Sequence, residues 1–464
     1  MRSTREILSK VIVCLVALAL CTGTARANSG DSANVANSAN SASSSGSASS
    51  ANSTSNGSPS DNGGWWDPRT WPNFPRWRWL DPRGWPFTLI PLPIIIEDPN
   101  AGTTVGVMPV FLFNDEHHHI REIFAPDVND NTNMGAGGTV RYLSYPSEDT
   151  QWYAIGSASE NIARRVDLLY STGRTRQNWW SFEARFFFER DPTERFFGLG
   201  NESRKRAESN FTTEQVYTRL RLGLNLSPEL QVAIEERPRY GRVQSGALTG
   251  SVPSIETNFP TLKGLNGGSE LMNRVIVSYD TLDSVDIPSS GGSAILYAGV
   301  ADRRFGSSYS YTEFGAELKR FVRVNNRIVL AGRLYAQYIP AGNETPFFAM
   351  SRLGGQESVL AYQQTLRGYG AGRFVDNNLS VGNLEMRTRV FEATIFDTHG
   401  ILEVAPFIEA GKVFHTVRDN PVNRLHPVGG LGVRAIAEPF VVGFVDFGVG
   451  SEGGSVFTGI NYPF

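Results

Sequence analysis

The chain has 464 residues, a formal net charge of −3 and 11% aromatic residues. This nearly balanced charge provides no strongly basic surface, so we expect no nucleic-acid partner. With 47 glycines and 25 prolines, the composition is compatible with one large β unit.

The first 27 residues are predicted to be a signal peptide. Basic residues precede the apolar run Val11–Leu20, and Ala25-Arg26-Ala27 offers a small-residue cleavage site. The chain's two cysteines, Cys14 and Cys21, both lie in this segment. We therefore expect an exported chain without disulfides or thiolate metal sites. A lipid anchor at Cys21 is disfavoured, because Leu20 stands where a small residue is wanted.

Two segments of different composition come next. Residues 28–64 are almost entirely Ser, Asn, Ala and Gly, a composition that predicts a disordered spacer. Residues 65–91 are rich in Trp, Pro and Arg, and the proline density excludes a continuous helix or strand. Such a segment suits a membrane-water interface or the groove of a periplasmic partner, and the alternative is a stiff linker packed on the next domain. The candidate contact residues are Trp66, Trp71, Trp77, Trp79 and Trp85.

From about Leu92 to Phe464 the side chains alternate with a period of two. In the segment 214–225, for example, Leu220 and Leu222 share one face while Arg219 and Arg221 share the other. Segments of about ten residues with this pattern are typical of transmembrane β-strands, with one face toward lipid and one toward a polar lumen. A soluble sandwich also alternates, but about sixteen such long segments favour a membrane barrel.

The lengths of the connections support a barrel, because long and short ones alternate as in outer-membrane proteins. No apolar run is long enough for a membrane-spanning helix. The long connections, expected outside the cell, are 114–133, 190–210, 240–269, 342–377 and 414–426; the tight ones, expected in the periplasm, are 146–150, 172–177, 226–229, 323–326 and 438–439.

Arg367 lies in the longest of these connections. An arginine among turn residues is by itself more often a solvated loop residue. The following strands, however, carry Glu385 and Glu409 on the parity expected to face inward. A guanidinium stays charged at any relevant pH and can bind carboxylates bidentately. The pattern therefore favours a loop that is latched to the inner wall.

The order and spacing of four motifs resemble those of the BamA/TamA superfamily, the bacterial surface-antigen barrels. The motifs are Leu366-Arg367-Gly368-Tyr369, Gly372-Arg373-Phe374, Asn383-Leu384-Glu385 and Phe407-Ile408-Glu409-Ala410-Gly411, and Tyr279–Asp283 and Phe196–Asn201 add further matches. The resemblance covers about residues 92–464. It implies an all-β transmembrane antiparallel barrel in the bacterial outer membrane.

The resemblance also implies a long sixth outer loop that folds into the lumen. There Arg367, next to Gly368 and Tyr369, would pair with Glu385 and Glu409. The implied function is insertion, assembly or translocation of proteins or lipids at the outer membrane, with outer-membrane lipid and an unfolded outer-membrane or secreted protein client as partners. Well-known members carry POTRA domains, and residues 28–91 are too short and too rich in Ser and Pro to form one. The alternative is a passive pore or a surface-exposed structural barrel.

A weak seam between the first and last strands is a second feature that the resemblance implies. Pro109 lies in the predicted first strand, while Pro463 and the terminal aromatic Phe464 lie in the predicted last one. Each proline removes a donor from the ladder. Simple fraying is an alternative explanation for Pro463, and the missing donor of Pro109 could instead face the second strand.

Other chemistries find little support in the sequence. His117, His118 and His119 could bind a transition metal, but a solvated polar loop is the preferred interpretation. The chain has neither a G-x-S-x-G nucleophile elbow nor a phosphate-binding loop. We therefore expect no enzyme activity, no metal and no cofactor.

Overall fold

The computed structural model describes residues 87–115, 120–248, 252–340, 342, 344–355, 366–395, 398–437, 441–460 and 462–464. The predicted signal peptide, the spacer, the tryptophans of residues 65–86 and the histidines at 117–119 lie outside these residues. None of the helices among the described residues is long and apolar enough to cross a membrane.

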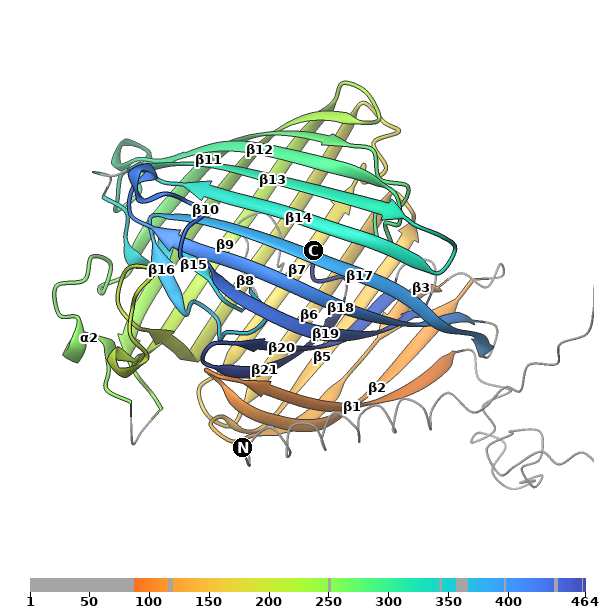
Figure 1. The fold of residues 1–464 in the computed structure, drawn as a ribbon, viewed down its shortest axis with the longest axis horizontal. Coiled ribbons are helices and arrows are strands. Elements are labelled where there is room, and N and C mark those ends of the chain that lie inside the picture. Colours follow the sequence, from red (N-terminus) through yellow and green to blue (C-terminus); the bar gives the residue numbers. More distant parts are fainter. Residues whose placement is uncertain are drawn as a thin grey trace, which may run out of the picture.

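The described residues form an antiparallel β-barrel with strongly tilted strands (Figure 1). Its wall consists of β1 (Thr88–Asp98), β2 (Gly102–Asn114), β3 (Ile120–Phe124), β4 (Asp127–Asn131), β5 (Gly135–Ser147), β6 (Thr150–Ser159), β7 (Arg164–Thr172), β8 (Trp180–Phe196), β9 (Ser209–Asn225), β10 (Leu230–Ser245), β11 (Gly268–Asp280), β12 (Gly291–Ala301), β13 (Tyr311–Arg323), β14 (Ile328–Tyr338), β17 (Asn378–Ile395), β18 (Thr398–Phe414), β19 (His426–Ala437), β20 (Val441–Gly450) and β21 (Gly453–Ile460).

Short elements lie in the connections. β15 (Ser351–Leu353) and β16 (Phe374–Asp376) pair with each other outside the barrel sheet. The short helices are η4 (Lys205–Ala207), α2 (Ile255–Asn258), η5 (Arg303–Phe305), η6 (Phe347–Ala349) and η7 (Val417–Asp419).

The prediction of an outer-membrane type barrel is confirmed, and the predicted number of strands is roughly right. β3 and β4 both pair with β2 and β5, so they share one position in the wall. The nineteen strands of the described sheet thus fill eighteen positions, against about sixteen predicted. β1 was not counted, because its first residues were assigned to the proline-rich segment 65–91, in which no continuous strand was expected. β3 and β4 lie within 114–133, which was wrongly predicted to be a long outer loop.

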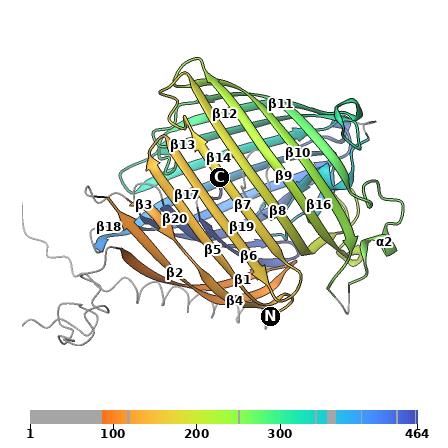
Figure 2. The ribbon, with the colours of Figure 1, turned by 180° about the vertical axis from the view of Figure 1, so that it is seen from behind.

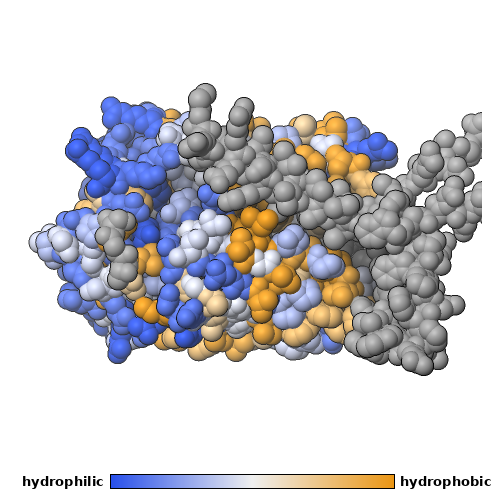
Figure 3. All heavy atoms as spheres, turned by 90° about the horizontal axis from the view of Figure 1, so that it is seen from below, coloured by the Kyte–Doolittle hydropathy of each residue, from blue (hydrophilic) through white to orange (hydrophobic). Residues whose placement is uncertain are grey.

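The two faces of the wall differ as the alternation predicted. On β9, Leu220, Leu222 and Leu224 are exposed, whereas Arg219 is buried on the inner side. Hydrophobic residues gather in a band across the wall, and hydrophilic residues dominate the end that carries the long loops (Figure 3). This distribution fits a lipid-facing exterior and a polar lumen.

The inner face near the first strands is an exception, because it is apolar. β1 pairs with β2 over its whole length, and side chains from β1, β2, β3 and β5 pack into one cluster there. Its members include Ile90, Leu92, Val110, Leu112, Ile120, Ile123 and Tyr145. This cluster, together with the ladder to β2, holds β1 in the wall.

The long loop between β14 and β17 is the seventh connection at the outer end, not the sixth. β1 forms a hairpin with β2, the predicted first strand, and the turn of this hairpin adds one connection at the outer end before all the others. Long loops and tight turns otherwise lie at opposite ends, as predicted.

The turn between β11 and β12, residues 281–290, reaches across the periplasmic end of the lumen. Ile287 packs against the opposite wall at Ile401, Ile436 and Val442. Arg174 binds Asp286 at 2.5 Å and joins this turn to the one between β7 and β8. The turn therefore narrows the periplasmic mouth.

Hydrogen bonds fix the shape of this turn. The Ser289 hydroxyl and the main-chain N–H groups of Ser289 and Ser290 donate to Asp283 at 2.5, 2.8 and 3.0 Å. Arg323 adds an ion pair at 2.9 Å. Burial raises the pKa of Asp283, but the bonds from the two serines outweigh it and bring the pKa down to about 2.

Candidate functional site: the inward-folded loop and the barrel seam

The loop between β14 and β17 enters the lumen from the outer end. Its descending part passes through η6 and β15, and its ascending part returns through β16. A bridge between Gly355 and Leu366 joins the two parts below this hairpin. Residues 366–373 follow and form the described part of the loop tip, and residues 356–365 lie outside the described residues.

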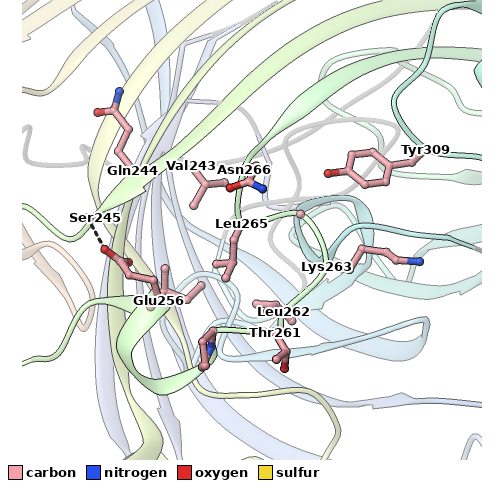
Figure 4. A pocket seen from close by; sticks show the side chains of 13 residues that line it. Val243, Gln244, Ser245, Glu256, Thr261, Leu262, Lys263, Leu265, Asn266 and Tyr309 are labelled. Carbon is pink, nitrogen blue, oxygen red and sulfur yellow. Dashed lines mark hydrogen bonds between the residues drawn. The ribbon is translucent and has the colours of Figure 1, made fainter.

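The loop between β10 and β11 covers the outer side of this inward-folded loop. Phe347 and Phe348 of η6 are buried against Leu262 and Leu265 of the covering loop. A pocket of about 750 Å³ lies between the covering loop and the end of β10 (Figure 4). In it Glu256 accepts a hydrogen bond from Ser245. The pocket is at the outer rim, away from the motifs that the sequence singled out.

Arg367 is completely buried among acidic side chains of the inner wall. Its Nε donates to Glu409 Oε1 at 2.7 Å, and its main-chain N–H donates to Glu409 Oε2 at 2.7 Å. Its Nη1 lies 3.0 Å from Glu385 Oε2. The guanidinium also stacks on the Phe407 ring, with 3.6 Å to the ring centroid. The structure thus brings Arg367 against both carboxylates that strand parity singled out.

Sequence reasoning missed a third carboxylate at this site. Asp446 Oδ2 accepts a hydrogen bond from Arg367 Nη1 at 2.7 Å, and its side chain is fully buried. Asp446 is the single charged residue of β20, VVGFVDFGVG. This single charge in an otherwise apolar membrane strand is the sequence signal that could have identified Asp446 as a site residue.

Two further arginines complete the charge network. Arg434 donates to Glu385 at 2.7 Å and lies 3.5 Å from Asp446. Arg387 Nε donates to the other oxygen of Glu385 at 2.8 Å. Glu385 therefore has three cationic partners, so Arg367 is one of several groups that neutralise it.

Glycines make room for the loop against the wall. A Cβ on Gly448 would lie 2.1 Å from the carbonyl oxygen of Arg367, and one on Gly368 would lie 2.8 Å from the main-chain N of Gly450. Backbone thus meets backbone at these two points. The Gly after Arg367 is needed because of this close approach, not because of its backbone dihedral angles.

Tyr369 and Arg373 fasten the rest of the loop tip. The Tyr369 ring is buried, and its hydroxyl is 2.9 Å from Ser451 Oγ in the connection between β20 and β21. Arg373 Nε donates to Glu452 in the same connection at 2.7 Å. Asn100, between β1 and β2, donates to the carbonyl oxygen of Ala371 at 2.8 Å. The loop therefore contacts both sides of the seam at its outer end.

The seam lies between β1 and β21, so the predicted position of Pro109 was wrong. Pro109 belongs to β2 and stands opposite Pro91 of β1. On its other side it faces the gap between β3 and β4, where Pro126 interrupts the wall strand. Among the described residues, one register pair joins β1 to β21, Glu97 with Val456.

Pro463 and Phe464 also lie elsewhere than expected. β21 ends at Ile460, so neither residue belongs to the closing strand. Phe464 is buried in the lumen with Phe321 and Ala331. The structure thus retains the last strand, β21, as one side of the seam. The prolines at the seam are Pro91 and Pro93 of β1, and not Pro109 and Pro463.

Residues 151–434 match the Omp85 superfamily domain. No curated protein sequence matches the chain.

Three of the similar solved structures align with this chain so that each alignment covers 81% of it. BamA from Haemophilus ducreyi lacking POTRA domains 1–3 is 13% identical, with a TM-score of 0.46, and 74% of its chain is covered. CdiB from Escherichia coli is 13% identical, with a TM-score of 0.43, and 62% of its chain is covered. CdiB from Acinetobacter baumannii is 10% identical, with a TM-score of 0.40, and 59% of its chain is covered. The family match spans more than half of the chain, which therefore belongs to the Omp85 superfamily and is a β-barrel of the bacterial outer membrane.

Proposed function

We propose that this barrel inserts or translocates a client protein at the outer membrane through the seam between β1 and β21. The observation that carries the proposal is the single register pair between these strands among the described residues. The neighbouring pair β20–β21, in contrast, keeps its register from Gly443 to Gly450. A wall can part at this weakly paired joint, whereas the continuous ladder between β20 and β21 holds.

The prolines of β1 support this proposal. Pro91 and Pro109 are opposite each other, and neither has an N–H group, so their pair is a non-hydrogen-bonded one. The backbone of Pro91 and, two residues on, of Pro93 then points toward β21. Both positions lack the donor that a closed ladder would need, and the periplasmic part of the seam cannot form those bonds.

The inward-folded loop has a matching role in the proposal. It holds both sides of the seam at the outer end and fills the lumen around Arg367. The lumen is further narrowed by the turn 281–290. Such filling favours a gated assembly or transport barrel over the passive pore that the sequence left open, and the proposed activity has no catalytic step.

A disulfide across the seam tests the proposal. The variant Glu97→Cys/Val456→Cys joins directly paired residues, whose separation in an antiparallel ladder suits a disulfide. We expect the oxidised protein in proteoliposomes to lose insertion of an outer-membrane client and to recover it after reduction. The matched control is Val445→Cys/Thr458→Cys, which bridges β20 and β21 and is expected to leave insertion unchanged. Equal insertion by the oxidised and reduced seam variant would refute a seam mechanism.

A further inference from the structure

Arginines form a row on the outward face of the barrel, near its outer end. Strands β7 to β10 lie side by side in the wall (Figure 2). The register of their ladders places one residue of each strand opposite the next, in the order Arg164, Arg190, Glu214 and Arg242. These four residues, which we call the boundary row, make one continuous line across four strands.

The boundary row lies where the apolar surface of these strands ends. Side chains of a strand alternate between its two faces, so the next outward row toward the periplasm consists of Val166, Phe188, Val216 and Tyr240. Leu168 and Phe186 follow on the same face, and both are exposed. The strands are tilted, so the boundary row crosses the membrane surface obliquely, and long arginine side chains extend from it toward the lipid headgroups.

The charges of the boundary row are not balanced, because it has three arginines and one carboxylate. Glu214 lies 3.6 Å from Arg190 Nε and 3.9 Å from Arg242 Nη1, so it makes only long contacts with either one. Arg164 donates to main-chain oxygens beside the turn between β6 and β7. Like charges directly opposite in a ladder are destabilising, and Arg164 and Arg190 are such a pair. An anion between them would remove this cost.

The guanidinium groups are open to a ligand from outside the chain. The Arg190 side chain is 38% exposed and that of Arg242 is 57% exposed. Their hydrogen bonds go to neutral partners: Arg190 Nη2 donates to Gln244 Oε1 at 3.2 Å, and Arg242 Nε donates to the Tyr240 hydroxyl at 3.2 Å. A guanidinium has more N–H donors than these contacts use. The two side chains are therefore held in place and can still bind an anion.

We propose that the boundary row binds a lipid of the outer leaflet whose headgroup carries two phosphate groups. Guanidinium groups bind phosphate by bidentate, charge-assisted hydrogen bonds. One phosphate fits between Arg164 and Arg190, and the second binds Arg242. Neighbouring strands are about 4.8 Å apart, so the backbones of Arg190 and Arg242 are about 10 Å apart. A disaccharide headgroup with a phosphate at each end suits this separation, and its acyl chains cover the apolar rows below.

The proposed lipid site is local and separate from the seam. On β11, β12 and β13 the outward row formed by Asn273, Val300 and Thr312 carries no charge. Strands β2 to β6 stand between the boundary row and the seam. A lipid bound at the boundary row thus leaves the seam uncovered, and the inference does not depend on the proposed function.

Lipid binding to the purified full chain in detergent, measured by native mass spectrometry, tests the inference. The probe is lipid A with two phosphates, and the control probes are monophosphoryl lipid A and inorganic phosphate. Arg164→Gln/Arg190→Gln removes two charges of the boundary row. The matched control Arg303→Gln/Arg304→Gln removes two charges from the exposed hairpin end between β12 and β13. A hydrogen bond between charged groups changes affinity by about tenfold or more. We therefore expect the boundary-row variant to bind lipid A at least about tenfold more weakly, and the control variant to bind it like the natural chain.

A single variant and a folding control make the result decisive. Arg242→Gln should lose the preference for two phosphates over one, which provides a readout if the double variant does not fold. Heat resistance on gels shows which variants are folded. Equal weakening in the boundary-row and control variants would mean unspecific charge attraction and would overturn the inference. Equal affinity of the natural chain for the two lipids, or displacement of lipid A by inorganic phosphate at the same concentration, would also overturn it.

Discussion

Replacement of Arg367 by Ala is the sharpest perturbation of the inward-folded loop. The side chains of Arg367, Glu385, Glu409 and Asp446 are all fully buried, so these ion pairs are shielded from water. Loss of one partner from a buried pair costs about 3–5 kcal/mol, chiefly because the other charge stays uncompensated. At 1.4 kcal/mol per tenfold, we expect the population of the inward loop to fall by about 10²- to 4 × 10³-fold relative to the released one.

Glu409 accounts for most of this cost. Glu385 keeps Arg387 and Arg434 as partners. Glu409 keeps the Asn383 amide at 2.9 Å and loses its only guanidinium among the described residues. Neutralising this carboxylate in Arg367→Ala/Glu409→Gln should therefore recover more than half of the loss, a non-additivity that a double-mutant cycle measures.

Protease protection of the loop, heat resistance of the folded barrel on gels and single-channel conductance are the assays. We expect Arg367→Ala to expose the loop, lower the heat resistance and raise the conductance. The control Arg304→Ala removes an exposed arginine that pairs with Asp302 at the outer rim, and it should change none of these values. Unchanged protection and conductance in Arg367→Ala, or a double variant no better than the single one, would refute the latch.

Three other predictions concern the loop, the periplasmic turn and the seam. Gly448→Ala places a Cβ against the Arg367 carbonyl oxygen, so it should expose the loop to protease as Arg367→Ala does; full protection would contradict the close approach. Asp283→Asn should lower the free energy of unfolding by about 1 kcal/mol, since the carboxylate is partly solvated. Because the folded pKa lies below the ordinary 3.8, the contribution of Asp283 is complete well above pH 4 and is lost as the pH falls through about 2; urea titrations at pH 7 and pH 2.5 should show a smaller difference between the variants at the lower pH. Pro91→Val/Pro93→Val restores two donors, worth about 1 kcal/mol each, so it should raise the heat resistance and slow client insertion; unchanged values would mean that the prolines do not keep the seam open.

The sequence predicted the features that depend on local alternation. A side chain's parity along a strand decides whether it faces lipid or lumen, so Glu385 and Glu409 could be placed on the inner face without knowledge of the fold. It could not identify Asp446 as their companion. Which inward residues meet depends on how the strands are staggered around the closed barrel, and no local pattern contains this stagger.

The first strands were mispredicted for a different reason. Proline lowers the expectation of a strand because it removes a donor, but this cost vanishes where the missing donor would point at an unpaired edge. β1 lies at such an edge, and the apolar cluster around Ile90 and Leu92 holds it to the wall. Its prolines were therefore evidence of its position in the barrel, not evidence against a strand.

The same prolines connect the seam with the interior of the barrel. They deprive the periplasmic part of the seam of two donors, and the residues that would have paired there, among them Tyr462, must satisfy their groups elsewhere. Inside the lumen they find Arg387, which already binds Glu385 beside the loop anchor. The Arg367 guanidinium also lies 5.9 Å from the Phe464 ring, so a change at Pro91 or Pro93 that draws the segment 462–464 into the wall should alter the surroundings of Arg367.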